Sequence, residues 1–256
     1  ITFGDFTTKG LVRVGIRGTN FLPGKRFKWE YVLDGCTFPT DYYGMGFDHG
    51  DYDVMKTQFR RNRFIFENFF LFRLKDNLYF GPHVSYDWLG AAKVKLPAKA
   101  GVDAVRGEEN VGLPVESHTE QVTLEDGTSE ERVVDYYDTF DGQKRKTGAL
   151  SLGATLTYDS RDFTLNASKG MYFQLDQTVS PSCFSNMGLF ATTEVTFDIY
   201  RKAWKGAIIA YDLHGQFVWG DQPYWNFMSE LGNAKRMRGY YEARYRDRHL
   251  VETQIE

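Results

Sequence analysis

Acidic side chains and a histidine gather in the run FDHGDYD, residues 47–53. Asp48, Asp51 and Asp53, with His49 among them, could offer carboxylate oxygens to a hard cation. Their spacing matches no recognised calcium-binding loop, and acidic outer loops are common in surface proteins. We therefore expect no metal at this segment.

His214 is a second candidate for chemistry. It stands two residues from both Asp212 and Gln216, so on a strand the three side chains share one face. Acyl transfer would need a nucleophile beside the histidine, yet no serine flanks it there and the chain contains no G-x-S-x-G elbow. We expect a solvated histidine and no catalytic site.

Cofactor and nucleic-acid binding also find little support. The run Gly44-Met45-Gly46 is not a dinucleotide fingerprint, because no helical pattern follows it. Cys36 and Cys183 are far apart and match no metal spacing, so we expect two unpaired residues near loops. The net charge of −3 leaves no basic patch for nucleic acid. The sequence thus predicts no cofactor, no metal and no enzymatic activity.

The composition is unusual for a soluble enzyme. Aromatic residues make up 16% of the 256 residues, while the mean hydropathy is −0.46. No stretch approaches the roughly 18 to 20 apolar residues of a membrane helix. A transmembrane β-barrel can nevertheless have a low mean hydropathy, because every second residue of its strands faces a polar lumen.

Alternation with a period of two runs through four consecutive segments, 149–158, 171–179, 189–199 and 207–219. The apolar residues of these segments are predicted to point outward to lipid, among them Leu152, Leu156, Phe173, Leu175, Val195, Phe197, Ile209 and Leu213. The polar residues are predicted to point inward, among them Thr155, Gln174, Glu194, Asp212 and His214. Runs of about 10 to 14 residues suit a tilted strand that crosses a bilayer better than the strands of a soluble sandwich. The sequence therefore predicts an all-β, antiparallel transmembrane barrel.

Nine strands are expected, at about 10–18, 26–35, 52–74, 78–90, 147–158, 170–180, 188–201, 206–220 and 247–256. Short connections alternate with longer ones at 36–51, 91–146 and 221–246, which places the longer ones outside the cell. The single barrel domain, 1–256, is expected to be incomplete at both ends, since single-chain bacterial barrels have an even number of strands and an open edge in lipid leaves backbone groups unpaired. The complete barrel is expected to have about sixteen strands, of which this chain would supply roughly nine or ten. The charged stretch 91–146 is predicted to be a long extracellular loop.

Two motifs suggest a family. Met237-Arg238-Gly239-Tyr240, followed by Arg244-Tyr245-Arg246-Asp247, resembles the inward-folded outer loop of the Omp85 superfamily, the BamA/TamA-like surface-antigen family, whose hallmark is V-R-G-F/Y. Residues 158–170, YDSRDFTLNASKG, resemble the periplasmic turn of the same family and contain Asp159, Arg161, Asp162 and Gly170. A methionine replaces the usual valine at position 237. The resemblance covers nearly the whole chain.

The resemblance implies a Gram-negative outer-membrane barrel that assembles other barrel proteins or exports a partner chain, without covalent chemistry. Its partners would be outer-membrane lipid and lipopolysaccharide, client barrel proteins and other subunits of an outer-membrane complex. It also implies that the loop 221–246 folds into the lumen, where we expect Arg238 to meet Glu194, Asp198 or Asp212 and to matter more than Arg236. Two alternatives stay open: a passive channel or structural barrel, and the barrel half of a patatin-like phospholipase.

Overall fold

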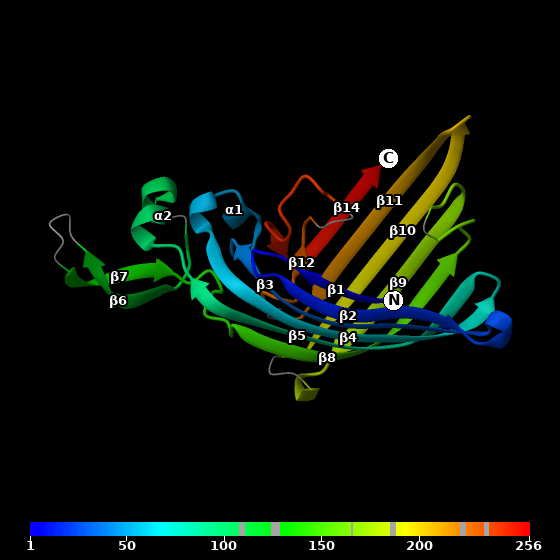
Figure 1. Cartoon of the computed structure of the whole chain (residues 1–256), viewed down its shortest axis with the longest axis horizontal. Coiled ribbons are helices and arrows are strands. Elements are labelled where there is room, and N and C mark those ends of the chain that lie inside the picture. The colour runs from blue at the N-terminus through cyan, green and yellow to red at the C-terminus, as the bar shows by residue number, and fades with distance from the viewer. Residues whose placement is uncertain (108–110, 124–128, 165, 185–187, 221–223, 233–235) are drawn as a thin grey trace.

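The computed structural model describes residues 1–107, 111–123, 129–164, 166–184, 188–220, 224–232 and 236–256. Its main element is one antiparallel sheet of ten strands in the order β1-β2-β3-β4-β5-β8-β9-β10-β11-β14. Each strand pairs with the next one in this order, so the sheet is a meander interrupted only by excursions at the loops. Figure 1 shows the sheet as a curved wall, with α1, α2 and the β6–β7 hairpin gathered at one of its ends.

The strands of the wall are β1 (Thr2–Phe6), β2 (Val12–Phe21), β3 (Phe27–Tyr42), β4 (Thr57–Lys75), β5 (Leu78–Lys95), β8 (Lys146–Asp159), β9 (Gly170–Ser180), β10 (Phe190–Trp204), β11 (Ala207–Trp219) and β14 (His249–Ile255). Two small hairpins lie outside it: β6 (Val115–Thr123) with β7 (Ser129–Tyr137), and β12 (Ser229–Glu230) with β13 (Arg246–Asp247). The helices are α1 (Phe47–Gly50), α2 (Lys99–Arg106) and the short 3-10 turns Pro23–Lys25, Asp53–Met55 and Ser182–Phe184.

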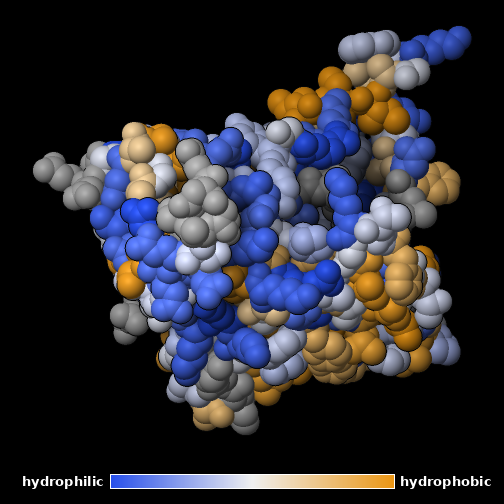
Figure 2. Space-filling view, turned by 60° about the vertical axis from the view of Figure 1, so that its left-hand side comes forward, coloured by the Kyte–Doolittle hydropathy of each residue, from blue (hydrophilic) through white to orange (hydrophobic). Residues whose placement is uncertain are grey.

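The two faces of the wall differ as the alternation predicts. On one face polar side chains contact one another across strands: Thr155 donates to Asp176 at 2.5 Å, and His83 lies 2.8 Å from the same carboxylate. On the other face large apolar side chains are open, with Leu152 43% and Ile209 45% exposed. The predicted all-β antiparallel fold is therefore confirmed. Figure 2 views the loop end, where most of the surface is hydrophilic and hydrophobic surface gathers at the lower right.

Several elements differ from the sequence-based expectation. β1 was not expected, because a strand of five residues is too short to show a convincing alternation. β3 continues to Tyr42, so the connection expected at 36–51 begins later. β4 is one strand of 19 residues, with a register shift between Gln58 and Arg60. Contrary to expectation, the single-turn helix α1 directly follows Gly46.

The insertion between β5 and β8 is more ordered than its charged sequence suggests. It contains helix α2 and the β6–β7 hairpin, and an isolated bridge joins Ala98 to Tyr136. Val102 of α2 and Tyr137 of β7 are buried together with Met55 and Val111. The expected loop therefore shares a small apolar core with the connection between β3 and β4, to which Met55 belongs. Within the residues that the structure describes, no helix is long and apolar enough to cross a membrane.

Candidate functional site

The turn between β8 and β9 is held by its own carboxylates. Arg161 donates to both carboxylate oxygens of Asp159, at 2.9 and 2.8 Å. Asp162 accepts from the backbone N–H groups of Phe163 and Ser168 and from the Ser168 hydroxyl. These bonds, first among them that from the Ser168 hydroxyl, hold the pKa of Asp162 well below its usual range.

Gly170 closes the same turn in a conformation that other residues rarely adopt, with φ at +106°. A Cβ at this position would lie 2.4 Å from the carbonyl oxygen of Ser160, so no side chain fits. The carboxylates and the glycine of the turn motif therefore have a structural role. The guanidinium of Arg161 also lies over the ring of Tyr172, 4.5 Å from its centroid, and so reaches the polar face of the wall.

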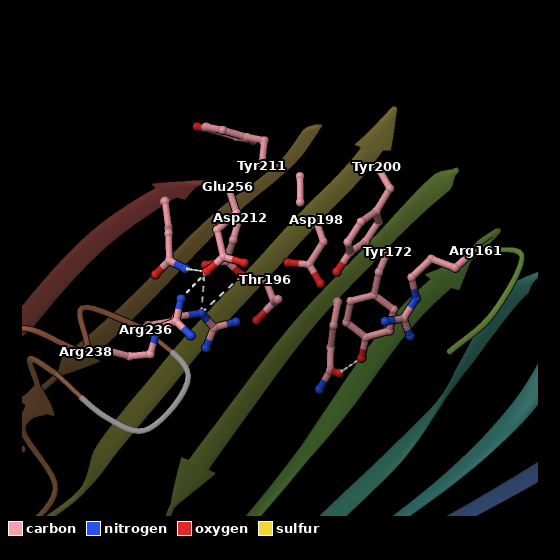
Figure 3. Close-up of a pocket in the computed structure, with 13 residues that line it drawn as sticks. Arg161, Tyr172, Thr196, Asp198, Tyr200, Tyr211, Asp212, Arg236, Arg238 and Glu256 are labelled. Carbon is pink, nitrogen blue, oxygen red and sulfur yellow. Dashed lines mark hydrogen bonds and ion pairs between the residues drawn. The ribbon is translucent and has the colours of Figure 1, made fainter. Parts of the chain in front are cut away.

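Beside this arginine lies a polar hollow of about 650 Å³. β9, β10, β11, β14 and the loop between β11 and β14 surround it (Figure 3). Its lining comprises Arg161, Tyr172, Gln174, Thr196, Asp198, Tyr200, Ala210, Tyr211, Asp212, Arg236, Arg238, Gln254 and Glu256. The hollow therefore brings both sequence motifs to one region of the polar face.

The arginines of the loop motif meet different carboxylates from those expected. Arg236 pairs with Asp212 at 2.9 Å, and both side chains are half-buried. Arg238 pairs instead with Glu256, and its side chain is 61% exposed. Of the expected acceptors, Asp212 bonds an arginine of this loop, and that arginine is Arg236 rather than Arg238. Figure 3 shows both guanidinium groups pointing toward these carboxylates.

The other two expected acceptors lie on the same face of β10. Asp198 is the register partner of both Asp212 and Tyr172, so it belongs to the wall of the hollow. Glu194 lies further along the strand, with its carboxylate 3.9 Å from the ring of His214. His214 is 6% exposed and bonds the Thr196 hydroxyl, so it is not the solvated residue that the sequence suggested.

Residues that the sequence analysis did not single out anchor the loop at the end of the wall where the insertion between β5 and β8 begins. Trp225 is fully buried, and its ring centroid lies 4.8 Å from that of Phe140 and 5.3 Å from that of Tyr42. Its indole N–H donates to the carbonyl of Lys144 at 3.0 Å. The signal available in the sequence was a tryptophan within a long polar loop, because so large an apolar side chain is rarely left in solvent.

Arg246 is the most deeply buried arginine of the loop, with 4% of its side chain exposed. It forms an ion pair with Glu230 at 2.5 Å and donates to the backbone oxygen of Trp225. Burial alone would raise the pKa of Glu230, but Arg246 and Arg61 lower it to about 2. Of the basic residues that follow the motif, Arg246 therefore belongs to a buried ion-pair network and is not exposed to solvent.

The acidic run 47–53 also contacts the loop. Asp53 pairs with Arg244 at 3.0 Å, and Asp51 accepts from the hydroxyl of Tyr245 at 2.9 Å. Across the described ranges, no group of three or more histidine, cysteine or acidic side chains is arranged to hold a metal ion. Cys36 is half-buried, Cys183 is exposed, and neither forms a disulfide.

The comparisons with known proteins bear on the family and the fold. Residues 79–250 match the Omp85 superfamily domain, while no curated protein matches the sequence. Among solved structures, the fold is similar to the crystal structure of BamA from Haemophilus ducreyi lacking POTRA domains 1-3, with a TM-score of 0.52 and 12% identity. That match covers 94% of this chain and only 40% of the BamA chain, so at this identity it concerns the fold alone. The family domain covers most of the sequence, from β5 to the start of β14, and includes both motifs. The chain therefore belongs to the Omp85 superfamily.

Proposed function

We propose that this chain is part of an outer-membrane barrel that assembles other barrel proteins or exports a partner polypeptide. The observation that carries the proposal is the loop 224–246, which lies against the polar face of an Omp85 wall through Arg236, Trp225 and Arg246. A loop folded against the inner face would be available to respond to a chain that passes or pairs with the wall.

The location that fits this role is a Gram-negative outer membrane. The open apolar face of the wall would contact lipid, with lipopolysaccharide in the outer leaflet, and the polar face would line the lumen. The β6–β7 insertion, α1 and the loop 224–246 would lie on the extracellular side, because the short turns lie at the other ends of the strands. Client barrel proteins and further subunits of a complex would be the polypeptide partners.

The proposed function does not require this chain to make or break a covalent bond. Client strands can be recognised by backbone hydrogen bonding at a sheet edge, which needs neither a nucleophile nor a cofactor. The polar groups of the hollow bind one another across strands and are suited to placing the loop.

Depletion of the full-length protein in its own cells would test the proposal. The expected result is a loss of other barrel proteins from the outer membrane, or of one exported polypeptide, while inner-membrane proteins stay at their normal levels. Quantitative mass spectrometry of membrane fractions would measure both. Unchanged outer-membrane and secreted proteins, together with ion conductance by the purified protein, would contradict the proposal and favour a passive channel.

A further inference from the structure

A hollow of about 490 Å³ lies at the end of the wall where the short turns are. Its volume falls within the range of ligand pockets. The turn between β8 and β9 forms one side of the hollow, and the end of β10 forms the other. Among its lining residues are Tyr158, Lys169, Met171, Ile199, Arg201 and Lys202.

The hollow exists because β10 extends past its neighbour. The register of β10 with β9 ends at the pair Tyr200–Gly170, whereas its register with β11 continues to the pair Trp204–Ala207. Figure 1 shows the hairpin of β10 and β11 projecting beyond the end of β9. The hollow occupies the notch between this hairpin and the β8–β9 turn.

The floor of the hollow belongs to the apolar face of the wall. Met171 and Ile199 are register partners. They stand two positions along their strands from Phe173 and Phe197, which are partners on the lipid-facing side. Side chains two positions apart on a strand share a face. The floor is therefore on the outside of the barrel, away from the lumen.

Two cations, Lys169 and Arg201, form the rim of the hollow. Both are exposed. They would be the next pair if the register that ends at Tyr200–Gly170 continued by one residue. Like charges directly opposite each other on neighbouring strands are destabilising. An anion bound between the two rim cations would remove this repulsion.

The carboxylates of the neighbouring turn are occupied elsewhere. Asp159 binds Arg161, and Asp162 accepts from the Ser168 hydroxyl and from backbone groups of the turn. Among the residues that the structure describes, no carboxylate forms an ion pair with either rim cation. The rim cations are therefore available to an anion from outside the chain.

The depth of the hollow matches the headgroup region of a bilayer. Lys169 is six residues from Leu175, the middle residue of β9. With about 3.4 Å per residue and a tilt near 45°, the rim would lie about 14 Å from the midplane, just beyond an apolar band about 25 Å tall. Trp204, near the end of the same hairpin, is 72% exposed, and tryptophan is enriched at membrane interfaces.

We propose that this hollow binds an anionic phospholipid of the leaflet at the turn ends of the barrel. Lys169 and Arg201 would hold its phosphate, and Met171 and Ile199 would contact the first carbons of its acyl chains. Basic side chains near a membrane surface attract anionic lipid, which is the charge complementarity that this site provides. The proposal rests on the membrane location proposed above, and not on the role in assembly or export.

Photolabelling of the full-length protein in vesicles would locate the lipid. The probe is a phosphatidylglycerol with a photoreactive group on the first carbons of one acyl chain, at a low fraction in phosphatidylcholine vesicles. Mass spectrometry would identify the labelled peptides. The segment 170–201 should be labelled more by this probe than by a phosphatidylcholine that carries the same group. This preference should fall as salt is added, since salt screens exposed charges.

Each rim cation should contribute about fivefold to the preference, and loss of both should lower it about thirtyfold. Lys169→Gln, Arg201→Gln and the double variant would measure these contributions. Arg201→Lys keeps the charge and should keep most of the preference. Lys75→Gln is the matched control, because Lys75 is exposed at the same end of the wall, on β4 and outside the hollow. It should leave the preference unchanged.

Folding of each variant would be checked by the heat-dependent mobility of the barrel on gels. If a glutamine variant fails to fold, the salt dependence of the parent protein tests the same charges without a substitution. A preference that is as strong in the folded double variant as in the parent would overturn the site, and so would a preference in the parent that salt does not change.

The outcomes also separate the site from the proposals made above. Equal labelling of the segment 170–201 by both lipids would overturn the site and leave the membrane location intact. No labelling of the apolar face by either lipid would contradict the membrane location, and the site with it. A preference that depends on the rim cations, together with unchanged client and exported proteins on depletion, would support the site and count against the proposed function.

Discussion

Arginine at the centre of the apolar face is a direct test of which side of the wall meets lipid. Leu175 is the middle residue of β9, five residues from each end of the strand. Its cross-strand partners are Leu156 and Val195, so the three form one outward row. With about 3.4 Å per residue and a tilt near 45°, Leu175 would lie about 12 Å from each end, close to the midplane of an apolar band about 25 Å tall.

The expected cost follows from this depth. Leu175→Arg should lower the free energy of unfolding in phospholipid vesicles by about 2 to 4 kcal/mol. Ile209→Arg lies on the same face but only two residues from the start of β11, so it should cost about 0 to 1 kcal/mol. Gln174→Arg, next to Leu175 but on the polar face, should change the free energy by less than about 1 kcal/mol.

Urea titration of the full-length barrel in vesicles, followed by tryptophan fluorescence, would measure the three variants on one scale. The order Leu175→Arg, then Ile209→Arg, then Gln174→Arg is the essential result. If Leu175→Arg and Gln174→Arg cost the same, the assignment of the two faces is wrong. If Ile209→Arg costs as much as Leu175→Arg, the placement of the midplane is wrong.

Three further predictions concern the loops and turns. Protease added to intact cells should cleave within 91–146, and cleavage only after permeabilisation would reverse the orientation. Arg236→Ala should lower the free energy of unfolding by about 1.5 to 3 kcal/mol, because its pair with Asp212 is half-buried; an unchanged free energy in urea titration would contradict this. The folded pKa of Glu230, about 2, lies below its ordinary value of 4.5, so its stabilising contribution is complete above pH 4.5 and is lost as pH falls toward 2. Pepsin cleavage of the loop should therefore increase across this range in the parent protein but not in Glu230→Gln, and the same increase in both would refute the assignment.

The insertion between β5 and β8 illustrates what sequence patterns miss. Its hairpin consists of charged strands such as Ser129–Tyr137, whose polar residues occupy both faces. Alternation predicts a strand only where one face is buried, and here the buried contacts come from Val102 and Met55 elsewhere in the chain. The order of this insertion is therefore a tertiary effect.

At the candidate site, too, local sequence patterns do not predict burial or ion-pair partners, as His214 and the arginines of the loop illustrate. His214 was expected on the polar face and lies there, but its burial comes from neighbouring strands and the returning loop. The pairing of Arg236 with Asp212 depends on where the loop meets β11, and that of Arg246 with Glu230 on the register of the β12–β13 hairpin. Neither pairing follows from the local spacing of the residues.

The sequence by itself determined nine of the ten strands of the wall, their two faces and the family. Alternation is a local property of the extended chain, because successive side chains of a strand point to opposite faces. Leu156 and Thr155 can therefore be assigned to opposite faces before their partners are identified. The turn motif is local too, because Asp162 binds backbone groups a few residues away. Only the tertiary structure decided that Arg246 is buried, because the rings of Tyr42 and Trp225 that surround it come from separate parts of the chain.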